Sequence, residues 1–358
     1  MTILNVLTVF KKALKKIQTI YFCLKKIDWR KAYTLYNKEA DIILWYYPLY
    51  RKNIFTQSIE RDFAFINAFV EQNLPFKVFF GKNIGKYSNK KIFYSVTKYY
   101  DGNGFKNYAM ILYHISKQLE EQSNIVYPTS HETLLWENKL HMHKQFNDLN
   151  INQPKTVFIS QETDLSKIEL DYPFLIKEPH SSSSMGLYKV NSLTELHNLI
   201  NTKKPFSRNN ALLAQKIIDM RKDVRVILVG DKIMLHYWRI NLSNEWKPTA
   251  TGYGSKVDFE FFPNKWEDYI KNEFKKLNIT TGGFDVTWDK DDLEKEPYFL
   301  EISPFYQPNP KADMTNVSYS YGEYKKKFKL INSWDKIFVD VVFELQSETV
   351  SHFLNKHA

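Results

Sequence analysis

The sequence is poor in cysteine, in glycine and in long apolar runs, and each shortage excludes a class of protein. Cys23 is the single cysteine among 358 residues, which excludes an internal disulfide framework and a cysteine-based metal site. The chain has 11 glycines and lacks the glycine fingerprint of a dinucleotide site, since Gly102 and Gly104 mark only a turn. No apolar run approaches membrane-spanning length, and lysines interrupt the N-terminus before a signal-peptide core could form. We therefore expect a cytoplasmic protein.

The composition is that of a globular protein with an excess of positive charge. The chain is 43% hydrophobic and 25% charged, and its length allows two or three domains with real cores. The net charge of +10 suits anionic partners such as nucleotides, phosphorylated sugars or a lipid surface. We do not expect nucleic-acid binding, because the basic runs at 11–16 and 325–329 look like solvated faces or a surface contact. The composition leaves the oligomeric state open.

Residues 1–28 form a basic segment with the apolar spacing of a helix. Positions 1–27 contain six lysines and no acid. Alternating steps of four and three join the apolar residues into one stripe: Ile3, Leu7, Phe10, Leu14, Ile17, Tyr21 and Leu24. Two interpretations fit. The helix either covers the core of the body, or it lies on an anionic membrane surface.

Residues 29–129 alternate between strand-like and helix-like segments, which predicts a parallel α/β domain. The predicted strands are 40–48, 75–81, 91–96 and 124–129, and the predicted helices are 58–73 and 108–122. A helical apolar period then covers 130–150, beginning at a capping serine. His141 and His143 lie two apart on it and so make poor joint metal ligands.

The rest of the chain predicts two further units, 130–208 and 209–358. Strands are expected near 155–159, 172–177 and 187–190, a helix at 192–201, and a hairpin within 211–240. The hairpin turns at Gly230-Asp231, and glycine first in a two-residue turn suits type II′. A helix at 264–277, a strand pair within 282–303 and a helical tail at 330–357 complete the prediction.

Charged residues recur inside or beside the apolar strands of these two units. A buried charge is costly unless it is paired or bound to something charged. A nucleoside triphosphate with Mg²⁺ would supply such partners, since its phosphates pair with cations and its metal ion with carboxylates. Four cations and three acids have this placement: Lys139, Lys177, Asp223, Arg225, Arg239, Asp285 and Glu301.

Residues 134–302 resemble the ATP-grasp enzymes, closest in pattern to their carboxylate–amine ligases. Lys139 and Lys177, the latter in "PFLIKEP", match the two phosphate-binding lysines of that superfamily. The small-residue segment "HSSSSMG" matches its loop over the β- and γ-phosphates, where small side chains let backbone N–H groups approach. The resemblance therefore implies an α/β (α+β) ATP-grasp fold after the N-terminal domain, and these loop residues at the phosphates: Ser182, Ser183, Ser184 and Gly186.

The same resemblance assigns the adenine site to "LLAQKII". The family usually has Gln-Glu at Gln215-Lys216, so the glutamate is missing, while the backbone contacts of Lys216 and Ile218 are retained. Asp219 stands at the ribose-binding position. Asp223, Arg225 and Arg239 reproduce the spacing of the family's hairpin. With a two-residue turn and strict alternation, however, Arg225 and Arg239 would face opposite sides of the hairpin. Both can reach phosphate only if the strand twists or bulges near its end, which makes Arg225 the stronger candidate.

The resemblance also implies an Mg²⁺ site on the last strand pair. Asp285 in "GGFDV" and Glu301 in "FLEIS" match the metal-binding carboxylates. The family's third ligand is an asparagine, and this chain has Ser303, so water, Gln307 or Asn309 are alternative ligands.

The implied activity is ATP-dependent amide formation from a carboxylate and an amine, with ADP and phosphate as products. The candidate substrate segments are 244–262 and 304–310, where Trp246, Tyr253 and Tyr306 could stack on sugar rings. We expect small-molecule or glycan substrates, specifically a bacterial surface-polysaccharide precursor at the inner membrane face. The alternative functions are a phosphotransferase acting on a sugar or an amino-acid-like acceptor, and a nucleotide-binding protein without turnover.

Overall fold

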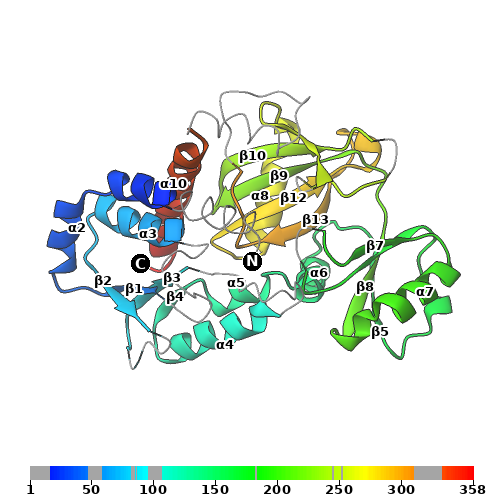
Figure 1. Ribbon diagram of the computed structural model, residues 1–358, viewed down its shortest axis with the longest axis horizontal. Helices are drawn as coiled ribbons and strands as arrows, with labels where there is room; N and C mark the ends of the chain where they lie inside the picture. Colours follow the sequence, from blue (N-terminus) through cyan, green and yellow to red (C-terminus); the bar gives the residue numbers. More distant parts are fainter. Residues whose placement is uncertain are drawn as a thin grey trace, which may run out of the picture.

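The computed structural model describes residues 17–46, 59–81, 85, 87–95, 107–181, 184–243, 246–250, 253–309 and 333–358. In this part of the chain three β-sheets organise the fold (Figure 1). The N-terminal sheet, the small-lobe sheet and the C-terminal-lobe sheet follow one another along the chain.

The N-terminal domain is a parallel sheet with helices on both faces, as its alternating pattern predicts. Ile42 and Leu44 join the core on the side of one helix layer, and Ile43 and Trp45 join the core on the other. Both faces are thus buried, which is why these strands read as continuous apolar runs. The strands, in sheet order, are β2 (Phe76–Phe80), β1 (Ile42–Tyr46), β3 (Lys91–Tyr94) and β4 (Ile125–Tyr127). The helices are residues 17–26, α2 (Trp29–Tyr36), α3 (Ile59–Glu71) and α4 (Tyr108–Glu121).

The helix predicted over 130–150 is two helices, α5 (Ser130–Leu134) and α6 (Lys139–Asp148). Thr129, not Ser130, caps α5, in a reciprocal capping box with Glu132. Between the helices Glu137 has a φ of 46°, a left-handed value that breaks a helix, and Asn138 caps the new start. The break places Lys139 in the first turn of α6.

The small lobe is an antiparallel sheet covered by one helix. The order is β5 (Thr156–Ser160), β8 (Ala211–Lys216), β6 (Phe174–Lys177) and β7 (Leu187–Val190). Helix α7 (Leu193–Lys203) packs on its apolar face through the buried Leu196. Two short 3-10 turns, η1 (Leu165–Lys167) and η2 (Pro205–Ser207), complete the lobe.

The C-terminal lobe is an antiparallel sheet with α8 on one face. The sheet order is β11 (Lys256–Asp258), β10 (Lys232–Ile240), β9 (Lys222–Val229), β12 (Thr281–Thr287) and β13 (Tyr298–Ser303). Val224, Val226, Phe284 and Phe274 of α8 (Glu267–Lys276) belong to one buried cluster. Two short 3-10 turns, η4 (Asn264–Trp266) and η5 (Asp289–Asp291), complete this lobe. Helix α8 does not cover the opposite face, where Ile227 and Val229 pack against Tyr306 and Leu345.

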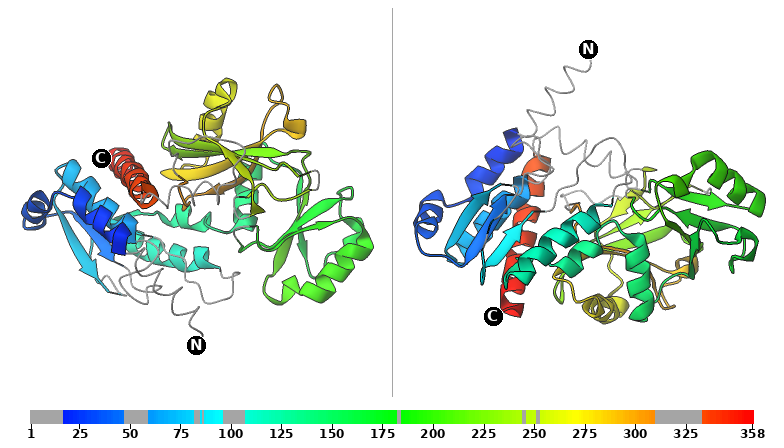
Figure 2. Two further views of the ribbon diagram at one scale, coloured as in Figure 1. Left: turned by 45° about the horizontal axis from the view of Figure 1, so that its top comes forward. Right: turned by 90° about the horizontal axis from the view of Figure 1, so that it is seen from below.

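The C-terminal helix α10 (Ser333–Lys356) contributes to two cores. The sequence places it within the 209–358 unit, yet its Val350 and Phe353 are buried in the core of the N-terminal domain, where α10 packs along α3. Its Leu345 also joins Ile227 of the C-terminal lobe. Helix α10 thus stands between the two bodies (Figures 1 and 2).

Candidate functional site

The charged residues of the C-terminal lobe lie on the face of its sheet that α8 leaves free. In an antiparallel pair, residues directly opposite each other share a face. Asp285 lies opposite both Arg225 on β9 and Glu301 on β13, and Arg239 on β10 lies opposite Asp223. Since residues two apart on a strand also share a face, all five side chains occupy one surface.

A β-bulge in β10 makes this arrangement possible. The hairpin turns at Gly230 and Asp231 as predicted, but the register shifts by one residue between Ile233 and Leu235. The shift reverses the alternation that would have put Arg239 on the face opposite Arg225. The bulge meets the condition under which both arginines can reach the same ligand, and Arg225 and Arg239 point to the same side of the sheet.

These residues form a compact ion network. Arg225 donates to both carboxylate oxygens of Asp285, with Nε–Oδ1 at 2.6 Å and Nη2–Oδ2 at 2.7 Å. Arg239 donates through Nε to Asp223 Oδ1 at 3.0 Å, and its Nη2 lies 2.9 Å from Asp285 Oδ2. Burial raises the pKa of Asp285, but the two guanidinium groups outweigh it and bring the pKa to about 2. Asp285 is therefore a carboxylate at neutral pH.

Lys177 brings a charge from the small lobe to this network. It ends β6 and is partly buried. Burial lowers its pKa to about 8, Glu301 and Asp285 act in the opposite direction, and Lys139 adds to the lowering. The charges that act on the Lys177 ammonium thus come from Lys139 of α6 and from Glu301 and Asp285 of the C-terminal lobe.

The segment after Lys177 is anchored at both ends. Glu178 N donates to Gly186 O at 2.8 Å, and Lys139 Nζ donates to the carbonyl of Ser181. The Glu178 side chain is fully buried and accepts from Arg208, Asn209 and Tyr188. Ser184 and Gly186 have positive φ values of 58° and 64°, which gives the loop a tight shape. Ser182 and Ser183 lie outside the described residues.

The candidate adenine strand is β8 and the residues after it. Gln215 is buried and its Nε2 donates to Thr156 Oγ1 at 2.8 Å. The backbone N–H of Lys216 donates to Lys155 O at 2.9 Å, so an adenine contact from Lys216 would use its carbonyl oxygen. Ile218 is buried and Asp219 is exposed, so the Asp219 carboxylate is accessible to a ribose.

The residues expected to bind metal fit a magnesium ion that takes most of its ligands from phosphate and water. Among the described residues, no group of three or more His, Cys, Asp or Glu side chains could hold a metal ion. Asp285 and Glu301 are cross-strand neighbours, however, and Mg²⁺ commonly uses one or two carboxylates plus substrate phosphates. Ser303 is opposite Gly283 on the same face, and its Oγ donates to Phe305 O at 3.0 Å.

The predicted aromatic substrate surface is only partly present. Tyr306 is buried, and its hydroxyl lies 2.8 Å from Thr281 Oγ1, so the expectation that it stacks on a sugar was wrong. Tyr253 is exposed, and the Lys189 ammonium lies 6.0 Å from the ring centre of Trp246. Asn309 Nδ2 donates to the Tyr237 hydroxyl at 2.8 Å, which occupies its amide nitrogen, and Gln307 is exposed.

The sequence reasoning missed His143 as a member of this region. The ring is buried, with Nδ1 2.5 Å from Gln153 Oε1 and Nε2 3.4 Å from Gln215 Nε2. Burial lowers its pKa to about 3, and Lys177 and Lys139 contribute, so the imidazole is neutral. The spacing in the sequence could have indicated this position: His143 lies four residues after Lys139, so both side chains lie on one side of α6.

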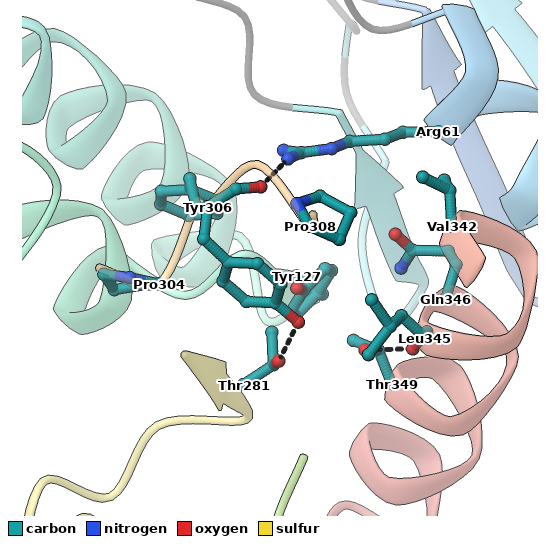
Figure 3. Close-up of a pocket in the computed structure, with 11 residues that line it drawn as sticks. Arg61, Tyr127, Thr281, Pro304, Tyr306, Pro308, Val342, Leu345, Gln346 and Thr349 are labelled. Carbon is teal, nitrogen blue, oxygen red and sulfur yellow. Dashed lines mark hydrogen bonds between the residues drawn. The ribbon is translucent and has the colours of Figure 1, made fainter. Parts of the chain in front are cut away.

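A small cavity lies between α10 and the segment that follows Ser303, and none of the five charged residues lines it (Figure 3). Its volume is about 40 Å³, room for a water molecule or two. Arg61 of α3 reaches into this region and donates to the carbonyl oxygen of Tyr306. The contact ties the N-terminal domain to the segment that follows Ser303.

Comparisons with known proteins agree with this architecture. No family model matches the chain. An α-aminoadipate–LysW ligase, LysX, of Saccharolobus solfataricus is 26% identical over 187 residues, which cover 49% of this chain and 66% of the relative. LysX of Sulfurisphaera tokodaii is 25% identical over 206 residues, or 54% of this chain and 70% of the relative. The matches thus span about two thirds of those relatives.

The solved structures extend the likeness to nearly the whole chain. The D-alanine–D-alanine ligase of Bacillus anthracis superposes with a TM-score of 0.54 at 11% identity, covering 89% of this chain and 100% of that chain. Its complex with ATP gives a TM-score of 0.52 at 12% identity, covering 88% and 97%. The chain therefore has the ATP-grasp fold and resembles the carboxylate–amine ligases of that superfamily.

Proposed function

We propose that this protein is an ATP-dependent carboxylate–amine ligase that forms an amide and releases ADP and phosphate. One observation carries the proposal: Asp285 lies directly opposite both Glu301 and Arg225 on one face of the C-terminal-lobe sheet, and Lys139 and Lys177 stand at the start of α6 and the end of β6. Cations on one lobe facing carboxylates on the other suit a triphosphate with its metal ion. The names of the LysX and D-alanine–D-alanine ligase relatives support the reaction class.

The first chemical step would form an acyl phosphate. A carboxylate oxygen of the substrate attacks the γ-phosphorus of ATP, the bond to the bridging oxygen breaks, and ADP leaves. Lys139, Lys177 and Arg225 would neutralise the charge on the transferring group. A magnesium ion held by Asp285 and Glu301 would add charge neutralisation at the phosphate oxygens.

The second step would make the amide. The amine nitrogen attacks the carbonyl carbon of the acyl phosphate, phosphate leaves with its bonding electrons, and the nitrogen gives up a proton to solvent. Arg239 is the residue we assign to the acyl phosphate or the substrate carboxylate, since it shares the site face with Arg225. Its pairing with Asp223 would hold the guanidinium in place during both steps.

We extend the proposal to the substrate class. The exposed Tyr253, and Trp246 beneath Lys189, supply ring faces on which a sugar could stack, so a bacterial surface-polysaccharide precursor is the acceptor we favour. We place the reaction at the inner face of a membrane.

The test follows the γ-phosphate and the carboxylate oxygen. The purified protein is incubated with γ-labelled ATP, Mg²⁺, hydroxylamine as the amine, and a panel of amino acids and sugar acids labelled with ¹⁸O in the carboxylate. A ligase gives a hydroxamate, ADP, and free phosphate that carries one ¹⁸O atom. Label held stably on the acceptor would instead establish a phosphotransferase, and AMP with pyrophosphate would contradict the assignment of Lys139 and Lys177 to the β- and γ-phosphates.

A further inference from the structure

The described part of the N-terminal apolar stripe faces solvent, and the stripe residues before Ile17 lie outside the described residues. In the helix at 17–26, Ile17, Tyr21 and Leu24 are 54%, 50% and 41% exposed. The other side of this segment carries the buried Cys23 and Ile27, which belong to the core of the N-terminal domain. The segment therefore covers the core, as one of the two interpretations expects, but it does so through Cys23 and Ile27 and not through the apolar stripe.

The next helix, α2, repeats the pattern. Trp29, Tyr33 and Tyr36 have the same spacing of four and three, and they are 43%, 72% and 41% exposed. Ala32 and Leu35 on its other side are buried in the same core. Two consecutive helices thus each bury small or aliphatic side chains and leave a row of large, mostly aromatic side chains uncovered. We call these six side chains and the helices that carry them, residues 17–38, the exposed aromatic face.

Positive charge is interleaved with these rings. The Lys25 ammonium lies 4.8 Å from the ring centre of Tyr21, and that of Lys77 lies 5.0 Å from the ring centre of Tyr36, both within cation–π range. Residues 17–38 hold a single acid, Asp28, and it is engaged in capping α2. The basic residues of this range are Lys25, Lys26, Arg30, Lys31 and Lys38.

We propose that the exposed aromatic face binds to an anionic lipid surface. Tyr and Trp favour the boundary between headgroups and acyl chains, and interleaved Lys and Arg are attracted to anionic headgroups. A second copy of the chain is a poorer occupant, because a two-fold interface would bring the same excess of positive charge together from both sides. In the described part of the chain, no helix is long and apolar enough to cross a bilayer. The proposed contact does not depend on the proposed reaction.

The test is vesicle binding by the full-length protein without ATP or substrate. Wild type is sedimented with vesicles of phosphatidylglycerol and phosphatidylcholine, and with vesicles of phosphatidylcholine alone. We expect binding to the anionic vesicles that falls with added salt, and at least a tenfold weaker affinity in Tyr21→Ser/Tyr33→Ser. The matched control is Phe158→Ser, which removes a 46% exposed ring from β5 of the small lobe and should bind as wild type does.

Charge reversal separates the two contributions. Lys25→Glu/Lys31→Glu should weaken binding to anionic vesicles and leave the thermal transition unchanged, since Lys25 is exposed and Lys31 partly so. Wild type that fails to bind anionic vesicles, or a tyrosine double variant that binds as tightly as wild type, would overturn the proposal. If light scattering shows that wild type is a dimer and that the tyrosine double variant is a monomer, the proposal is also overturned, and the face binds a second copy of the chain instead.

Discussion

At the scale of single residues, the two arginines of the site contact carboxylates, with Asp285 at the centre. Asp285 accepts from Arg225 and lies 2.9 Å from Arg239 while it faces Glu301 across the strand pair. The arginines keep it ionised, so a metal ion would compete for its oxygens with two cations. Glycine at 283 leaves room for Tyr306, because a Cβ there would lie 3.3 Å from Tyr306 Cβ.

The titration of Lys177 predicts a pH dependence of ATP binding. Its pKa of about 8 in the free protein lies below the ordinary 10.5, so the ammonium loses its proton as pH rises through 8. Because phosphate favours the protonated form, ATP affinity should fall by up to about tenfold per pH unit above 8, with proton uptake on binding. Calorimetry at pH 8.5 in two buffers of different ionisation enthalpy measures that uptake. In Lys177→Arg, which stays charged, the uptake should disappear, and an unchanged uptake would assign it to another group.

Ser303, at the expected third metal-binding position, leads to a prediction about the Mg²⁺ dependence of turnover. Glu301→Gln should remove most ATP turnover and raise the Mg²⁺ requirement, whereas Ser303→Ala should have a small effect, because a hydroxyl that donates to Phe305 O is a weak ligand. Ser303→Asn, which restores the amide implied by the resemblance, should lower the Mg²⁺ requirement. The measurement is turnover against Mg²⁺ concentration, and equal damage from Ser303→Ala and Glu301→Gln would show that Ser303 is a principal ligand.

At the scale of elements, irregularities position the site. The bulge in β10 turns Arg239 to the site face, and the break between α5 and α6 puts Lys139 in a first helical turn. The buried Glu178 plays a comparable part for the segment from 178 to 186, because its hydrogen bonds tie the base of that loop to Arg208 and Asn209. Side chains such as Glu178, which we do not expect to contact substrate, therefore help to hold the site in shape.

The Glu178 anchor gives an element-scale prediction. Glu178→Gln keeps the size of the side chain and removes the charge that pairs with Arg208. Breaking a buried pair of this kind is strongly destabilising, so we expect loosening of the loop, a higher KM for ATP and a lower thermal transition. The matched control is Glu169→Gln, whose exposed partner Lys155 lies 3.6 Å away and which should change neither quantity. An unaltered KM in a folded Glu178→Gln protein would contradict the anchoring role.

At the scale of the whole molecule, the C-terminal helix α10 packs against the N-terminal domain. It lies along α3 and also reaches Ile227 of the C-terminal lobe. Arg61 of α3 adds a polar tie to the Tyr306 carbonyl, close to the strand that carries Glu301 (Figure 3). The N-terminal domain is thus held to the segment that follows β13.

The role of α10 is tested by Phe353→Ala. Phe353 is fully buried against Phe93 and Tyr127. Its truncation should lower the free energy of unfolding by about 3–5 kcal/mol in denaturant titration. Asn355→Ala, two residues further on and exposed, serves as the control. A loss below about 1 kcal/mol would mean that α10 is not part of the N-terminal core.

The sequence by itself determined the fold class and much of the local structure. The parallel N-terminal sheet, the hairpin at Gly230-Asp231 and the charged residues of the site could be predicted, because strand alternation, turn preferences and motif spacing are properties of neighbouring residues. Only the tertiary structure decided the side to which Arg239 points, since one extra residue in a strand reverses every later side chain. It likewise decided that α10 packs on α3 and that Tyr21 faces solvent, because an amphipathic pattern does not say which distant surface will cover it.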